Sequence, residues 1–257
     1  CCGICNSRAI MPINSLDLKR RFGGIIRLYG LKKFKKFQSS HVCIIGIGGV
    51  GSWVAESMAR HGIGQITMID MDHIAESNIN RQIHALDSTL GHSKVDAMKL
   101  RILEINPKCK INCQDSFLEE ENICDLISQK FDFVVDAIDQ TKIKILLAEH
   151  CLHHSIPFIM TGGAGGKVNP ELIKIDILSK TFGDPLLSKI RQYFNKKQKL
   201  TKTKFKIPTV FSPETSIKPE KINLKESLTG LSCAGYGSSA NVTGTFAFIT
   251  TSYVLTN

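Results

Sequence analysis

Residues 41–51 read HVCIIGIGGVG, so a short apolar run passes directly into a glycine-rich sequence. The apolar run predicts a buried strand, and the GxGxxG pattern at 46–51 predicts a tight turn that opens a helix. Residues 65–70 form a second apolar run that ends in Asp70. Strand, glycine turn, helix and strand together predict a nucleotide-binding βαβ unit, in preference to a glycine turn that only connects two elements.

The pattern continues along the chain. Residues 131–136 and 157–160 predict further buried strands, and residues 92–105 and 141–154 predict helices. Strands that alternate with helices predict an α/β fold with a Rossmann-like, doubly wound, mostly parallel sheet and helices on both faces. Beyond residue 180 the pattern fades, so we expect a less regular C-terminal part.

Composition indicates a folded protein with polyanionic partners. Hydrophobic residues make up 42% of the chain, and 33 Lys and Arg against 23 Asp and Glu give a net charge of +10. Such a charge favours RNA or acidic phospholipid. The nine cysteines are dispersed, with no secretory leader, which predicts a reducing, cytoplasmic location. Cys2 and Cys5 form a CxxC motif without a second pair, so no zinc is expected.

The ends of the chain differ from its middle. We expect residues 1–18 to be a disordered segment and residues 19–257 to form a single domain, with 185–230 as a basic, partly flexible insertion. No charged residue follows Glu226. This uncharged tail predicts a buried terminal helix rather than a membrane span, and membrane association through it is the alternative to a purely cytoplasmic location.

Residues 185–206 carry many basic side chains and no Asp or Glu. A solvated, mobile surface and a surface that contacts RNA phosphates explain this composition equally well. The basic residues are Lys189, Arg191, Lys196, Lys197, Lys199, Lys202, Lys204 and Lys206.

Several polar residues favour nucleotidyl transfer over hydride transfer. Asp70 lies about 20 residues after the last glycine, where a carboxylate binds ribose hydroxyls. Arg81 and Lys94 then supply two fixed cations, which a transferring phosphate needs and a dinucleotide bound through backbone amides does not. Asp136 and Asp139 end a predicted strand, at the edge where such sheets bind ligands. Without this context, each acid would more often be a helix N-cap.

The order of these motifs resembles the ubiquitin-activating-enzyme superfamily, whose members adenylate carboxylates. The resemblance implies ATP and Mg²⁺ as cofactors, with Arg81, Lys94 and Asp139 in catalytic roles. It assigns the metal to Asp139 and makes Asp136 a weaker candidate. The residues that it places at the nucleotide are Gly46, Gly48, Gly49, Gly51, Asp70, Asn78, Arg81 and Lys94.

Within that superfamily, five stretches are similar to the tRNA threonylcarbamoyladenosine dehydratases. They are RFGGIIRLYG at 21–30, NRQIHAL at 80–86, DAID at 136–139, TGGAGG at 161–166 and VFSPE at 210–214. The resemblance implies an enzyme that cyclises threonylcarbamoyladenosine in tRNA with loss of water. The reaction passes through an acyl-adenylate and releases AMP and pyrophosphate. Arg21 stands where related enzymes lend an arginine to the ATP of the partner subunit.

The same resemblance implies a homodimer and a sulfur-transfer partner of the cysteine-desulfurase type. It also makes Cys233 a candidate transient acyl acceptor, although a small buried hydrophobe is the favoured interpretation of a free cysteine. Two other functions stay open at this point. One is adenylation of the C-terminal glycine of a small ubiquitin-like sulfur-carrier protein, and the other is an RNA- or nucleotide-binding module without turnover.

Overall fold

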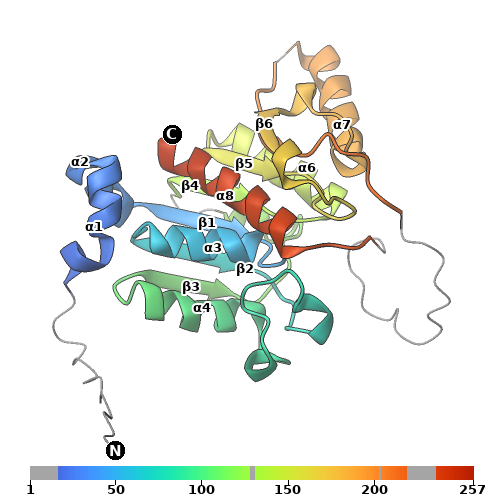
Figure 1. Cartoon of the computed structure of the whole chain (residues 1–257). Helices are drawn as coiled ribbons and strands as arrows, with labels where there is room; N and C mark the ends of the chain where they lie inside the picture. Colours follow the sequence, from blue (N-terminus) through green and yellow to red (C-terminus); the bar gives the residue numbers. More distant parts are fainter. Residues whose placement is uncertain (1–16, 128–130, 203, 219–235) are drawn as a thin grey trace, which may run out of the picture.

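The computed structural model describes residues 17–127, 131–202, 204–218 and 236–257. They build a seven-stranded sheet in the order β3-β2-β1-β4-β5-β7-β6 (Figure 1). Neighbouring strands run parallel except β6 and β7, which are antiparallel. The strands are β1 (His41–Ile45), β2 (Gln65–Ile69), β3 (Lys110–Gln114), β4 (Phe133–Asp136), β5 (Phe158–Thr161), β6 (Lys174–Ile177) and β7 (Pro208–Phe211).

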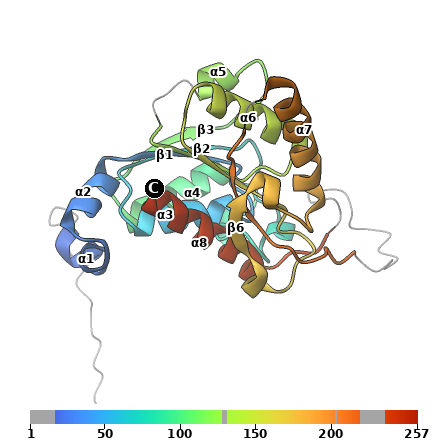
Figure 2. The ribbon, with the colours of Figure 1, turned by 90° about the horizontal axis from the view of Figure 1, so that it is seen from above.

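Helices cover both faces of the sheet (Figure 2). Val42 and Ile44 of β1 join the core under α3, α4 and α8, whereas Cys43 and Ile45 join the core under α6 and α7. Successive strand residues point to opposite faces, so each face receives its own apolar set. The α-helices are α1 (Leu18–Tyr29), α2 (Leu31–Ser39), α3 (Gly51–Arg60), α4 (Lys94–Ile105), α5 (Ile123–Leu126), α6 (Thr141–His153), α7 (Pro185–Thr201) and α8 (Ala240–Thr256).

The predicted fold class is confirmed. The strands and helices expected from the sequence correspond to β1, β2, β4, β5, α3, α4 and α6. Sequence reasoning missed the edge strands β3 and β6, the inner strand β7, and the first two helices. Short 3-10 turns complete the structure at Glu76–Asn78 (η2), Asp87–Thr89 (η3), Pro170–Leu172 (η4) and Leu178–Lys180 (η5).

Residues 240–256 of the uncharged C-terminal segment form α8, the buried terminal helix that the sequence predicts. It lies beside α3 on one face of the sheet (Figure 1). Phe246 and Ala247 are fully buried there, and the ring of Phe248 meets Trp53 edge to face at 6.1 Å between centroids. Among the described helices, none combines the length and the apolar character needed to cross a bilayer.

The segment expected to be a basic, partly flexible insertion contributes two elements to the fold. Residues 185–201 form α7, which buries Leu187, Ile190 and Phe194, and β7 pairs with both β5 and β6. The buried positions recur at helical spacing, so α7 is an amphipathic helix packed on the core. Residues 219–230 of the expected insertion lie outside the described residues.

Candidate active site

A cavity of about 810 Å³ opens at the carboxyl ends of β1 and β4. The chain winds from β1 to β2 and β3 in one direction, and from β4 to β5 and β7 in the other. The connections therefore leave a crevice between β1 and β4, the topological switch point where open α/β sheets bind ligands. The fold alone thus places the ligand site beside the glycine loop.

The four glycines of the loop have two different functions. Gly46 has φ +86°, and a Cβ there would lie 2.8 Å from the carbonyl oxygen of Ala137. A Cβ on Gly51 would lie 1.8 Å from the Gly46 carbonyl oxygen, so these two positions exclude side chains for steric reasons. Gly48 and Gly49 line the cavity, as does Gly46. Their backbone can approach a phosphate closely at the start of α3.

Asp70 follows β2 and lines the cavity, as predicted. Its two carboxylate oxygens accept hydrogen bonds from the backbone N–H groups of Ile47, at 2.6 Å, and Asp72, at 2.8 Å. Burial raises the pKa of this carboxyl above its ordinary value, and the nearby Lys94 opposes that shift. The bond to Ile47 ties the acid to the glycine loop, so the carboxylate and the loop are held in a fixed relation.

Arg81 and Lys94 reach the same cavity from different elements. The Arg81 side chain is oriented by the carbonyl oxygen of Ser77 at 2.7 Å and by Asn80 Oδ1 at 3.0 Å. Lys94 begins α4 and forms an ion pair with Asp72 at 2.6 Å. Both cations are at most 9% exposed. Fixed, largely desolvated cations are suited to stabilise charge that develops on a phosphate.

The two acids after β4 have different environments. Asp139 lines the cavity, but Asp136 is fully buried and does not. Asp136 Oδ1 accepts hydrogen bonds from Lys144 Nζ at 2.8 Å and from the backbone N–H of Ile138 at 3.1 Å. Burial raises the pKa of Asp136, and the Lys144 ammonium opposes the shift. The structure therefore uses Asp136 in a buried ion pair that fixes the turn carrying Asp139.

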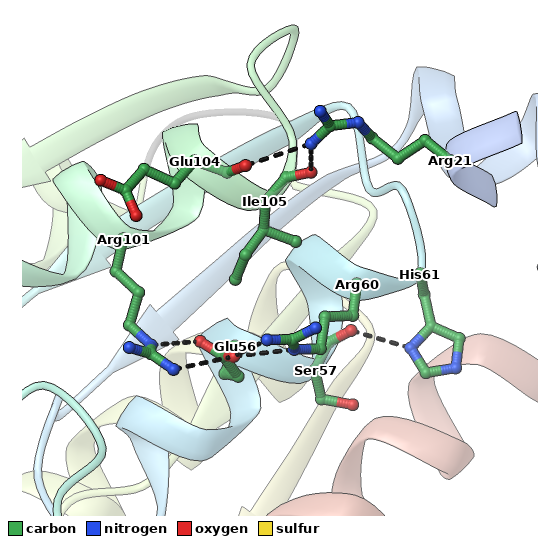
Figure 3. Close-up of polar contacts among 8 residues, drawn as sticks. All are labelled: Arg21, Glu56, Ser57, Arg60, His61, Arg101, Glu104 and Ile105. Carbon is green, nitrogen blue, oxygen red and sulfur yellow. Dashed lines mark hydrogen bonds and ion pairs between the residues drawn. The ribbon is translucent and has the colours of Figure 1, made fainter. Parts of the chain in front are cut away.

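Two other predicted residues lie away from the cavity lining. Asn78 is buried and its Oδ1 accepts a hydrogen bond from the backbone N–H of Ala75 at 3.1 Å, so it shapes the turn before Arg81. Arg21, on α1, donates from Nη1 to the carbonyl oxygens of Glu104 and Ile105 at 3.1 and 2.5 Å (Figure 3). It thereby binds the C-terminal end of α4 and does not reach the cavity of its own chain.

Sequence reasoning missed two polar residues, one that supports the glycine loop and one in the cavity lining. His84 Nε2 donates to the carbonyl oxygen of Ile47 in the glycine loop at 2.9 Å, and burial lowers the His84 pKa to about 4. The imidazole is consequently neutral at pH 7. Gln82 lines the cavity, and its buried Oε1 has no partner within the described residues. Both lie in the NRQIHAL stretch, but burial of a polar side chain is not visible in sequence.

The glycine-dense loop after β5 is the second wall of the cavity. Asp184 Oδ2 accepts a hydrogen bond from the Gly163 N–H at 2.7 Å, while Oδ1 caps α7 through the N–H of Leu186 at 2.8 Å. A Cβ on Gly162 would lie 2.3 Å from Asp184 Oδ2, so glycine is required there. An Asp before Pro185 is a helix-start signal that sequence reasoning could have used.

The acidic side chains of the described lining do not gather into a preformed metal cluster. Among the described residues, no group of three or more His, Cys, Asp or Glu side chains is arranged to hold an ion. A single carboxylate such as Asp139 still fits Mg²⁺, which usually binds one or two carboxylates together with substrate phosphates and water. Cys233, the candidate acyl acceptor, and the CxxC motif of Cys2 and Cys5 lie outside the described residues.

Comparisons with known proteins agree with this arrangement. The chain is 43% identical over 243 residues to a tRNA threonylcarbamoyladenosine dehydratase of Haemophilus influenzae, covering 93% of each chain. It is 41% identical over 248 residues to the Escherichia coli protein of that name, covering 92% of each. The crystal structure of the E. coli enzyme in complex with ATP matches with a TM-score of 0.84 and 39% identity, over 95% of this chain and 96% of that chain.

The family assignment rests on most of the chain. The ThiF family model matches residues 22–216, which include the glycine loop, Asp70, Arg81 and Asp139. The matched region contains every strand of the sheet. The chain therefore belongs to the ThiF family.

Proposed function

We propose that the protein is an ATP-dependent adenylating enzyme that dehydrates threonylcarbamoyladenosine in tRNA. One observation carries the proposal. The glycine loop, Asp70, Arg81, Lys94 and Asp139 meet in one cavity, in a chain that is similar over nearly its whole length to two bacterial dehydratases. A crystal structure of the E. coli relative in complex with AMP also matches, with a TM-score of 0.85.

In the proposed first step, the carboxylate of the threonylcarbamoyl group attacks the α-phosphorus of ATP and pyrophosphate leaves. The carboxylate is already ionised at neutral pH, so this step needs no general base from the protein. Arg81 and Lys94 stabilise the negative charge that builds up on the phosphates. Asp70 holds the ribose and thereby positions the α-phosphorus.

In the second step, an atom of the same threonylcarbamoyl side chain attacks the activated carbonyl carbon. A ring closes, the attacking group releases a proton, the bond to the adenylate breaks and AMP leaves with the carboxylate oxygen, so the net change in the nucleoside is the loss of one water. The cavity walls serve this step by orienting the activated group and excluding bulk water, which would otherwise hydrolyse the adenylate.

The charge of the cavity supports a metal cofactor. Its lining contains five acidic side chains, Asp70, Asp72, Glu119, Asp139 and Asp184, against three basic ones, Arg81, Lys94 and Lys189. A triphosphate adds further negative charge to this set. In the proposal, Asp139 holds Mg²⁺, which neutralises phosphate charge when it is bound.

The proposal includes a homodimer. The Arg21 guanidinium is directed to the end of α4 and away from its own cavity, so it can approach a nucleotide only in another protomer. A partner arginine would offset the acidic excess of the lining. The sulfur-transfer partner and the cytoplasmic location implied by the sequence stay predictions.

Exchange of labelled pyrophosphate into ATP tests the proposed function. We expect exchange that depends on tRNA containing threonylcarbamoyladenosine, with tRNA lacking the threonylcarbamoyl group as the matched control. Exchange that instead requires a small carrier protein with a C-terminal glycine would assign the alternative adenylation function. ATP binding without exchange in either case would make the protein a binding module.

Replacing Asp70 with alanine is expected to raise the KM for ATP by roughly 10- to 100-fold, because a charge-assisted hydrogen bond contributes about 1.5–3 kcal/mol. The ribose contacts are equal in ground and transition states, so kcat should change little. ATP titrations of initial rate measure both constants. Asp70→Asn, which keeps an acceptor for the Ile47 N–H, is the control, and an unchanged KM for Asp70→Ala removes Asp70 from the ribose site.

A further inference from the structure

Helix α7 begins at the wall of the active-site cavity. Asp184, Pro185, Leu186 and Lys189 all line the cavity, so the first turn of the helix forms part of the site. The helix has 17 residues, which corresponds to a length of about 25 Å. It therefore leads from the reaction centre to a part of the surface well away from it.

The basic residues of α7 fall into two groups. Arg191 donates to the carbonyl oxygen of Thr181 at 2.5 Å, and Lys197 pairs with Glu149 of α6, so both have internal partners. The remaining lysines are exposed, and within the described part of the chain they form no ion pair. These lysines are Lys189, Lys196, Lys199 and Lys202.

The unpaired lysines share one side of the helix with an aromatic ring. Lys189 and Lys196 are seven residues apart and lie on the same face, and Lys199 follows one turn later. Tyr193, which is 39% exposed, lies between Lys189 and Lys196 along the helix, and its hydroxyl donates to Glu149 Oε1 of α6 at 2.6 Å. Lysines interleaved with an exposed aromatic ring can bind phosphates and stack on an unpaired base.

We propose that this face, Lys189, Tyr193, Lys196 and Lys199, together with Lys202 directly after the helix, is the surface on which the tRNA docks. The inference rests on the proposed function and identifies where the substrate of that site is bound. When the threonylcarbamoyl group of the modified nucleotide enters the cavity, the neighbouring tRNA phosphates come close to the cavity lining, where Lys189 lies. The further lysines then extend the contact along α7, away from the reacting group.

Helix α2 offers a matched comparison. It exposes Lys32, Lys35 and Lys36, and it has no acidic residue. However, α2 directly precedes β1, so it lies at the amino ends of the strands (Figure 1). The cavity lies at the carboxyl ends of the strands. Removing charge there changes the net charge of the protein equally, at a site remote from the cavity of the same chain.

The test compares two triple variants with the wild type in tRNA binding at several salt concentrations. We expect K196Q/K199Q/K202Q to bind tRNA more weakly. The slope of log affinity against log salt concentration should become shallower by up to about 0.9 for each phosphate that the variant no longer neutralises. K32Q/K35Q/K36Q should keep the wild-type slope. The α7 variant should also raise the KM for tRNA while leaving ATP affinity and the rate at saturating tRNA unchanged.

Three outcomes overturn the proposal. The first is an α7 variant with the wild-type slope, and the second is an equal reduction of the slope in the α2 variant, which would show a general charge effect. The third is intact tRNA binding together with abolished binding to vesicles containing phosphatidylserine, which would assign the face to an anionic membrane. Failure of the proposed function has a different signature, because wild-type enzyme would then leave the bound tRNA chemically unchanged.

Discussion

Replacing Arg81 with alanine is expected to lower the turnover of ATP-dependent tRNA dehydration by about 10²–10³-fold, the effect typical of removing one donor to a developing charge. Arg81 is 9% exposed, and the Ser77 carbonyl oxygen and Asn80 hold its guanidinium in place. Its charge is therefore preorganised and poorly screened by water. Because the interaction strengthens as negative charge builds on the phosphates, kcat should fall together with kcat/KM.

Single-turnover measurements of AMP formation with modified tRNA test this expectation. Arg60→Ala is the matched control, since Arg60 is an exposed arginine on α3 and its partner Glu56 keeps two hydrogen bonds from Arg101 (Figure 3). Arg81→Lys separates charge from geometry, because lysine keeps the charge and loses the planar fork. Near-normal AMP formation by Arg81→Ala would contradict the proposed adenylation mechanism.

Replacing Lys144 with alanine is expected to lower the free energy of unfolding by about 3–5 kcal/mol, the typical cost of removing one partner from a buried ion pair. Lys144 is 0% exposed, and it supplies the only ammonium that the described residues place on Asp136. The variant leaves a buried carboxylate without its counterion. Since Asp136 Oδ2 already has no partner among the described residues, the local structure offers no replacement.

The loss of unfolding free energy in Lys144→Ala should depend on pH in one direction. Burial raises the pKa of Asp136 in the folded state, and removal of Lys144 takes away the main opposing influence. A folded-state pKa above the unfolded value means that the folded protein binds the proton more readily, so protonation relieves the penalty. The difference in stability between Lys144→Ala and the wild type should therefore shrink as the pH falls through the folded pKa of Asp136.

Chemical denaturation at several pH values measures this difference. The control is Asp136→Asn combined with Lys144→Met, which removes both charges and should recover most of the stability, because an uncharged pair of similar volume is often tolerated. A Lys144→Ala deficit of less than about 1 kcal/mol, independent of pH, would show that the ion pair does not support the turn after β4.

The sequence predicts the nucleotide-binding half of the fold well because its signals are local. The run HVCIIGIGGVG contains a strand, a turn and the start of a helix, and Asp70 ends the next strand, so no long-range contact is needed to identify them. The same holds for Asp139, which follows the end of β4 by three residues. Ligand sites at the switch point follow from strand order alone.

The missed elements depend on contacts between distant segments. β7 has only four residues and lies next to a lysine-rich stretch, yet it is an inner strand because β5 and β6 pair with its two edges. Lys144 gave no signal either, since a lysine in the sequence TKIKILLAEH is expected to face solvent. Its burial follows from Asp136, which is eight residues earlier and on another element.

The phosphate role expected for Asn78 illustrates a different limit. A motif indicates that a residue matters at a site, but it does not separate contact with the ligand from support of the loop. The structure places the Asn78 side chain on the backbone of Ala75, and its carbonyl oxygen accepts from the N–H of Arg81 at 3.1 Å. These contacts fix the turn before Arg81, and the phosphate role of Asn78 stays a prediction.

Mass spectrometry of tRNA nucleosides tests the central claim most directly. The wild-type protein would be incubated with ATP, Mg²⁺ and tRNA that contains threonylcarbamoyladenosine, and the nucleosides would then be compared with samples prepared without ATP or with Arg81→Ala. We predict that threonylcarbamoyladenosine is converted to a product lighter by one water, only with ATP and wild-type protein, together with AMP and pyrophosphate. Unchanged threonylcarbamoyladenosine, with AMP formed only when a carrier protein is added, would contradict the account.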